Sequence, residues 1–442
     1  MGIAIEEIRL SEIYRRMRPT PYGIGLLALC IYVGMCEGFD VQAMALAAPL
    51  VAKAWQLKSA TIGILLSASV IGQVAGSFLL SPLGDRWGRR PAILLALLLT
   101  SVATFAGAFA PNVLAMLATR FAAGFALGLA LSNTTAVAME VVPLRWRTIA
   151  VVLVCCGYPL GAAIGAAAVG PLLSGHGFAA IFHVGGFGTL AAFALCALFL
   201  PETPYILLRD RSRQAALHRL LSRLGVALST TAIIKADRVA GSASPIAELF
   251  VPERRGVTLL LWVLNFANLS LVYYFILWLP SLFVNRGLEA HAAVAATSLF
   301  SASGIVGGLL MAALLSRFGP IATLGSCYLV TIVAVLAFSG VVAIGPAFYV
   351  TLAICGMMIV GSQFSLSAVV NQFYPDAMRA TGAGFALGAG RLGAVSAPLV
   401  GGLIVAGVRS PATAFAIAAV PAFVSLIAIL ALRSYGLSKS LR

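Results

Sequence analysis

The 442-residue chain is 61% hydrophobic and charged at only 10% of its positions, with a mean hydropathy of +1.02. Charged residues normally supply about a quarter of a soluble chain, so this composition excludes a water-soluble globular protein and makes the lipid bilayer its expected solvent. The net charge of +15 does not indicate nucleic-acid binding, because the lysines and arginines stand in short segments between apolar runs.

Apolar runs of about 20 residues, the length that crosses a bilayer, recur along the chain. They predict an all-α membrane protein with twelve transmembrane helices, near residues 22–51, 60–80, 91–110, 113–139, 148–173, 178–200, 257–284, 292–315, 320–343, 346–373, 381–407 and 412–432. The first run is too long for a signal-peptide core and contains two acids, so we interpret it as a retained span.

Three charged residues stand inside the first four spans. Glu37 and Asp40 lie three apart in span one, on one helix face, and Arg120 lies in span four. Ionisable groups inside spans are costly and are kept by default for function. We therefore expect the three to take part in proton coupling; the alternative is a static ion pair that holds the amino-terminal half together.

The segment between spans two and three reads Gly84-Asp85-Arg86-Trp87-Gly88-Arg89-Arg90-Pro91. Its glycines permit a tight turn, and its arginines suit a generic positive-inside loop. The stretch also resembles the G-x-x-x-D-R-x-G-R-R motif of the major facilitator superfamily, in which this loop resembles a gate latch. The resemblance therefore implies a conformational gate, for which we select Gly84, Asp85, Arg86, Gly88, Arg89, Arg90, Glu140, Arg147 and Arg379.

A hydrophilic stretch, 201–256, separates a six-span half at 1–200 from another at 257–442. Within it, Gln214 to Arg223 could form a basic amphipathic helix on the anionic inner leaflet, or a plain solvated linker.

The two halves repeat at a nearly constant spacing. Pro49 and Pro280 are 231 residues apart, Arg86 and Arg317 are 231 apart, and Pro143 and Pro375 are 232 apart. The spacing thus predicts two six-helix repeats with a substrate site near the midplane between them, and the motif resemblance implies that they form the major facilitator fold.

Lysine and arginine are distributed unequally between the loops on the two sides. One side has 23 of them, whereas the other has four: Lys53, Lys58, Arg286 and Arg409. The positive-inside rule then places both termini in the cytoplasm. We expect a bacterial inner (plasma) membrane protein.

Three further stretches resemble the aromatic acid:proton symporter family. They are Cys36–Ala43, Cys156–Ala162, and Tyr374–Gly382 with its continuation to Gly393. That family usually has D-G-x-D in span one; here Glu37 replaces the first acid and keeps its charge on a longer side chain. The resemblance implies a transporter, not an enzyme, that imports a small aromatic carboxylate by alternating access. It would use the proton gradient and no cofactor, and we expect a monomer.

The resemblance also suggests roles for two arginines. Spans one and four line the cavity in this superfamily, so we expect Asp40 to pair with Arg120. Arg391, in span eleven, matches the family's arginine for the substrate carboxylate, and spans seven to twelve contain no acid that could bind it instead.

Other polar residues of the spans are less specific. They could bind the carboxylate, hydroxyls or ring of a substrate, or hold helices together: Asn133, Asn265, Asn268, Gln363 and Tyr274. The repeat spacing of 231 residues makes Asn268 the counterpart of Glu37 in the second half. At this position the second half therefore has a neutral residue, whereas the first half has an acid.

A drug or metabolite:proton antiporter of the same superfamily is the alternative function. Such exporters usually carry G-x-x-x-G-P in span five, whereas here Gly161 is followed by Ala162. The sequence also lacks a clustered Cys/His/Asp constellation of the kind that a membrane enzyme would need.

Overall fold

A computed structural model describes residues 7–173, 177–208, 213–226, 233–235, 246–252, 254–340, 344–374, 379–408 and 410–435. Within these residues, eleven helices are long and apolar enough to cross a membrane. One of them, α13 (Ala290–Gly340), contains a break at Gly319, whose φ of 76° and ψ of 173° are not helical. Because α13 holds the predicted spans eight and nine, the twelve-helix fold is confirmed.

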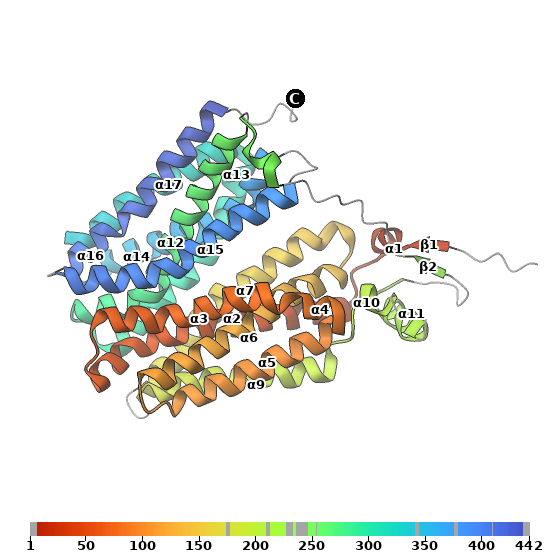
Figure 1. The fold of residues 1–442 in the computed structure, drawn as a ribbon, viewed down its shortest axis with the longest axis horizontal. Coiled ribbons are helices and arrows are strands. Elements are labelled where there is room, and N and C mark those ends of the chain that lie inside the picture. Colours follow the sequence, from red (N-terminus) through yellow and green to blue (C-terminus); the bar gives the residue numbers. More distant parts are fainter. Residues whose placement is uncertain are drawn as a thin grey trace, which may run out of the picture. The chain divides into compact units, whose positions relative to one another are not determined.

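The long helices follow the predicted spans closely (Figure 1). The first six spans are α2 (Pro21–Trp55), α3 (Ser59–Leu79), α5 (Arg89–Ala108), α6 (Val113–Glu140), α7 (Arg147–Val169) and α9 (Ala179–Phe199). The later spans are α12 (Arg255–Asn285), α13, α14 (Pro346–Phe373), α15 (Arg379–Gly407), and α16 (Pro411–Ile417) followed by α17 (Ala419–Ala431). Short helices flank them: α1 (Leu10–Arg16), α4 (Ser81–Trp87), α10 (Pro204–Leu208) and α11 (Gln214–Arg223).

Local sequence explains several helix ends. The side chain of Asn112 accepts a hydrogen bond from the backbone N–H of Ala115, which caps α6 at its start. Pro346 begins α14, where its missing N–H costs nothing. The left-handed φ of Gly319 suits glycine and ends one span just before the next begins.

Large apolar side chains remain exposed along the spans. Leu114, Phe109 and Leu198 are each about three-quarters exposed, at 76%, 75% and 76%. Apolar surface of this extent, spread over many helices, is expected of a protein whose solvent is lipid. The chain is therefore an integral membrane protein.

The chain forms two compact units, each built from several segments. Unit 1 comprises Met1–Val41, Ile71–Gly161 and Phe182–Gly241, and unit 2 comprises Gln42–Val70, Ala162–Ile181 and Ser242–Arg442. Within unit 2, Ser298 of α13 donates a hydrogen bond to the carbonyl of Ala163 in α7. The division at 1–200, 201–256 and 257–442 stays a prediction.

The hydrophilic segment departs from a purely helical picture. Strands β1 (Glu7–Arg9) and β2 (Ile233–Lys235) form a short parallel pair, which the sequence did not predict. The predicted helix at Gln214–Arg223 is present as α11. Its apolar residues Leu217, Leu220 and Leu221 are buried in the core cluster of unit 1, so that face is covered by protein rather than laid on the inner leaflet.

Candidate functional site

A buried ion pair links α2 to α6 in unit 1. Arg120 Nη1 donates to Asp40 Oδ1 across 3.3 Å, and the two side chains are 0% and 1% exposed. The predicted pairing of Asp40 with Arg120 is therefore present. Thr104 of α5 donates a second hydrogen bond to the same oxygen, at 2.6 Å. Desolvated charges are tolerated only with such partners, so this corner of unit 1 holds a fixed, compensated pair.

The guanidinium of Arg120 has further contacts that sequence reasoning missed. Its Nη2 donates to the carbonyl of Ala103 at 3.3 Å, and its Cζ lies 4.6 Å from the ring centroid of Phe182. A ring face this close stabilises a buried cation. Phe182 carries no charge and stands among many apolar residues, so only the packing of α9 against α6 could reveal its role.

The second acid of α2 has a different partner. Glu37 is 2% exposed, and Gln73 of α3 donates from Nε2 to its Oε1 at 2.5 Å. Gln73 is itself 6% exposed and was not among the predicted residues. A glutamine in the middle of the apolar run that forms α3 was the available signal. Although Glu37 and Asp40 share a helix face, their carboxylates thus accept hydrogen bonds from different side chains: Gln73 for Glu37, and Thr104 and Arg120 for Asp40.

In unit 2, Arg391 lies where α15 packs tightly on α12. A Cβ on its neighbour Gly390 would stand 2.6 Å from Leu269 and 3.2 Å from the carbonyl of Asn265. A Cβ on Gly393 would collide with the carbonyl of Phe266. The two glycines therefore bring the backbone beside Arg391 against the turn of α12 that carries Asn265, whose amide donates to the Leu261 carbonyl at 2.8 Å.

Asn268, one turn further along α12, is the centre of a buried polar cluster. Its Nδ2 donates to Gln363 Oε1 of α14 at 2.7 Å, and its Oδ1 accepts from Tyr328 at 2.9 Å and from Ser362 at 2.7 Å. The structure therefore brings the predicted residues Asn268 and Gln363 together. Tyr328 and Ser362 are additions that the sequence did not single out. These three hydrogen bonds hold the Asn268 amide and, through it, fix the orientation of Gln363, while one N–H of the Asn268 amide is not used by them.

Two of the predicted substrate residues, Tyr274 and Asn133, form hydrogen bonds with backbone carbonyls. The hydroxyl of Tyr274 donates to the carbonyl of Ala414 at 3.1 Å, which joins α12 to α16. Asn133 donates to the carbonyl of Leu129 in its own helix, and its side chain lies against Gly84 of the gate motif. For Tyr274 and Asn133 the geometry therefore favours holding helices together, the second role that polar residues play in membranes.

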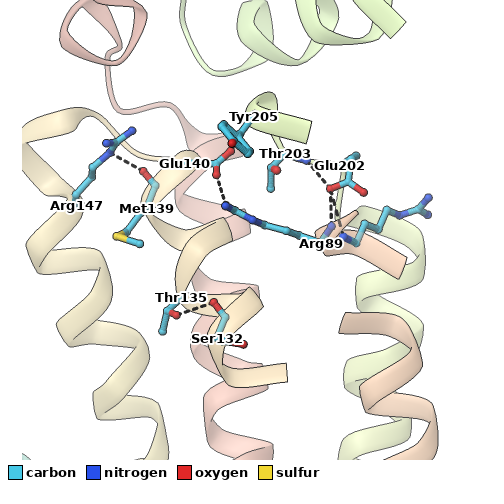
Figure 2. A network of polar contacts seen from close by, with 10 residues as sticks. Arg89, Ser132, Thr135, Met139, Glu140, Arg147, Glu202, Thr203 and Tyr205 are labelled. Carbon is cyan, nitrogen blue, oxygen red and sulfur yellow. Dashed lines mark hydrogen bonds and ion pairs between the residues drawn. The ribbon is translucent and has the colours of Figure 1, made fainter. Parts of the chain in front are cut away.

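Two of the predicted gate residues, Arg89 and Arg90, contact the carboxylates of Glu140 and Glu202 (Figure 2). Arg89 forms an ion pair through Nη1 with Glu140 Oε1, and both side chains are largely buried. Glu140 Oε2 also accepts from the backbone N–H of Tyr205 at 3.1 Å. One guanidinium thus ties the start of α5 to the end of α6 and, through Glu140, to α10.

Glu202 is the second carboxylate, and sequence reasoning missed it. Its Oε1 accepts from the backbone N–H groups of Arg89 at 3.0 Å, Arg90 at 3.4 Å and Thr203 at 2.9 Å. An acid there satisfies orphan donors at the start of α5 and suits the positive end of the helix dipole. Gly88, with φ of +112°, is needed beside it, because a Cβ there would collide with Glu202.

The other gate residues have varied surroundings. Arg90 donates to the carbonyl of Ala197 at 2.8 Å, and Arg147 donates to that of Met139 at 2.9 Å. Arg86 is exposed. The side chains of Asp85 and Arg379 lie outside what the structure describes, so their predicted roles stay predictions. Among the described residues no group of three or more His, Cys, Asp or Glu is placed to hold a metal.

Comparison with known proteins gives a consistent picture. The family model of the Major Facilitator Superfamily matches residues 30–393. A "Gallate transporter" of Pseudomonas putida is 29% identical over 92% of this chain and 91% of its own length. A "3-(3-hydroxy-phenyl)propionate transporter" of Escherichia coli is 30% identical over 86% of each chain. The crystal structure of a D-xylose-proton symporter superposes with a TM-score of 0.72 at 15% identity, over 95% of this chain and 99% of the other, which supports the fold alone.

Proposed function

Because the chain belongs to the major facilitator superfamily, and within it to the aromatic acid:proton symporter family, we propose that it imports a small aromatic carboxylate together with a proton. The chain is a transporter and not an enzyme. The observation that carries the proposal is the pair of buried acids in α2, one of them bound to a buried arginine. Groups of this kind inside spans mark ion and substrate pathways.

The substrate class follows from the chemistry of unit 2 and from the relatives. Gallate and 3-(3-hydroxyphenyl)propionate are aromatic acids with ring hydroxyls, and two relatives are named for transporting them. In this chain Arg391 would bind the carboxylate, since a guanidinium can donate two parallel hydrogen bonds to it. Asn265, Asn268 and Gln363 would supply hydrogen bonds to the carboxylate or to ring hydroxyls.

Charge balance suggests how the proton and the acid are linked. Glu37 and Asp40 offset Arg120 and Arg391, so the empty carrier is neutral when both acids are ionised. Protonation of one acid leaves a net charge of +1, which a substrate carboxylate neutralises. Half-loaded forms would bury an uncompensated charge and cross slowly. Empty and fully loaded carriers would therefore be the forms that cross the membrane by alternating access.

The setting we propose is a bacterial inner (plasma) membrane with both termini in the cytoplasm, because positive charge gathers in the loops on that side. The carrier would work as a monomer, driven by the proton gradient without a bound cofactor. The relatives favour this acid importer over the drug or metabolite:proton antiporter.

An uptake panel tests the proposal. Cells or liposomes that contain the protein are offered labelled benzoate, hydroxybenzoates, gallate and the non-aromatic acid muconate, with and without a protonophore. We expect saturable accumulation of at least one aromatic acid, abolished by the protonophore. Accumulation that survives the protonophore would contradict proton coupling, and uptake of the non-aromatic acid alone would contradict the substrate class.

A further inference from the structure

The two acids of α2 differ in the partners that hold them. From this difference we propose that Glu37, positioned by Gln73, takes up and releases the coupled proton, whereas Asp40 stays ionised throughout the cycle. This assignment rests on the proposed function, because it names which of the two carboxylates performs the coupling. Gln73 is a positioning residue in this scheme, and it acts through Glu37.

The surroundings of Asp40 favour the ionised carboxylate over the protonated one. Its Oδ1 accepts hydrogen bonds from Thr104 at 2.6 Å and from Arg120 at 3.3 Å. An arginine has five N–H donors and no acceptor, so it cannot accept a hydrogen bond from a protonated acid. A proton on Asp40 would also leave the fully buried charge of Arg120 without the anion that compensates it. Both contacts therefore suit a carboxylate that takes no part in proton transfer.

The partner of Glu37 suits both protonation states. A glutamine amide offers N–H donors and a carbonyl acceptor on one group. Gln73 Nε2 donates to Glu37 Oε1 at 2.5 Å, which serves the ionised carboxylate. When Glu37 is protonated, a rotation of the amide lets its oxygen accept the new O–H. The same pair of side chains can therefore hold Glu37 with and without its proton.

Two ionisable groups on described helices stand near Glu37. Asp40 stands one turn away on α2, and the Cys155 thiol of α7 interacts electrostatically with Glu37. Gln73 on α3 is neutral. Gly38, between the two acids, packs so closely on the carbonyl of Tyr158 in α7 that a Cβ there would collide with it. This contact fixes the turn of α2 that directs Glu37 to α3 and Asp40 to α5 and α6.

Proton balance in the step is simple. Glu37 gains one proton from the outside solution and forms one O–H bond, which breaks when the proton leaves to the cytoplasm. Asp40 and Arg120 exchange none. The carboxyl of Glu37 is thus neutral in the loaded carrier, and Arg391 is then balanced by the substrate carboxylate, as the proposed function requires.

The experiment compares two activities of the purified protein in liposomes. Counterflow exchanges labelled for unlabelled aromatic acid without net proton movement. Accumulation driven by a pH gradient, in contrast, requires protons to enter with the acid. For Glu37→Gln we expect at least a third of wild-type counterflow, a counterflow rate that no longer varies with pH, and no accumulation. For Asp40→Asn we expect at least a tenfold loss of both activities.

Gln73→Met keeps the size of the side chain and removes its hydrogen bonds. We expect the alkaline limb of its accumulation profile to move to higher pH, because the hydrogen bond to the ionised carboxylate is stronger than the one to the protonated form, so losing both disfavours the ionised acid. The control is Gln214→Met, the same change at the exposed first residue of α11, which should leave the profile unchanged. This comparison tests the assignment even if Glu37→Gln fails to fold.

Four outcomes would overturn the inference. If Glu37→Gln still accumulates the acid, or if Asp40→Asn shows the flat, uncoupled counterflow instead, the roles of the two acids are wrong although the symporter remains. If Gln73→Met has the wild-type pH profile, the positioning role is wrong. If the wild-type protein accumulates no aromatic acid on a pH gradient, the proposed function fails and takes the assignment with it.

Discussion

Arg120 and Asp40 form an ion pair across 3.3 Å in which neither side chain reaches solvent, at 0% and 1% exposure. Removing one partner of a buried pair costs about 3–5 kcal/mol, because the other charge stays buried without compensation. We expect Asp40→Asn to lower the free energy of unfolding by about this amount, measured as a lower melting temperature in detergent. The double variant Asp40→Asn/Arg120→Met should recover much of the loss; if the single variant melts like the wild type, the pair is not a buried charge pair.

Arg391 should tolerate lysine poorly. Lysine keeps the charge but cannot donate two parallel hydrogen bonds to a carboxylate. A hydrogen bond to a charged group contributes about 1.5–3 kcal/mol, so we expect Arg391→Lys to raise the Kd for the acid about tenfold or more. Equilibrium binding of a labelled acid measures this. Arg433→Gln, at an exposed arginine after α17, is the control and should leave Kd unchanged; an unchanged Kd in Arg391→Lys would remove Arg391 from the substrate site.

The packing of α15 on α12 depends on Gly393. Alanine there would place its Cβ against the carbonyl of Phe266, so the helices must separate at a cost of about 1–3 kcal/mol. We expect Gly393→Ala to lower the melting temperature and the uptake rate. Gly388→Ala, in the same helix but with open space around the new Cβ, should do neither. Equal behaviour of the two variants would show that this close approach is unimportant.

The ion pair of Arg89 with Glu140 should affect movement rather than substrate binding. Glu140→Gln removes the charge that binds Arg89 and weakens a link between α5, α6 and α10. A charge-assisted hydrogen bond contributes about 1.5–3 kcal/mol, so we expect the balance of conformations to change about tenfold and the uptake rate to fall, with Kd for the acid unchanged. Glu12→Gln, which breaks the exposed pair with Arg16, is the control and should keep the rate. A loss of binding in Glu140→Gln would argue against a gate.

Much of the fold could be predicted because lipid imposes a simple length rule on each span. The run predicted at 91–110 is α5, Arg89–Ala108, and the run at 346–373 is α14 with the same limits. Helix α11 was also predicted. The burial of its apolar face in the core cluster of unit 1 was not predicted, because a single sequence does not say which surfaces meet. The strand pair is short and joins distant segments, so its residues carried too little pattern to predict it.

The candidate site was predicted where charge made residues conspicuous. Asp40 and Arg120 stand out inside apolar spans, and their pairing is confirmed. Gln73, Phe182 and Glu202 were missed because each gains its role from a neighbour on another helix. For Asn133 the sequence left substrate binding and helix packing open, and its contact with Gly84 could not be predicted because that contact also depends on a second helix.

The central claim is that acid and proton move in the same direction. The most direct measurement follows the internal pH of proteoliposomes, with the membrane potential held at zero, after an aromatic acid is added outside. We predict internal acidification that exceeds that of protein-free liposomes, saturates with the acid and is absent in Glu37→Gln. Internal alkalinisation on addition of the acid, or uptake with no change in pH beyond the protein-free control, would contradict symport.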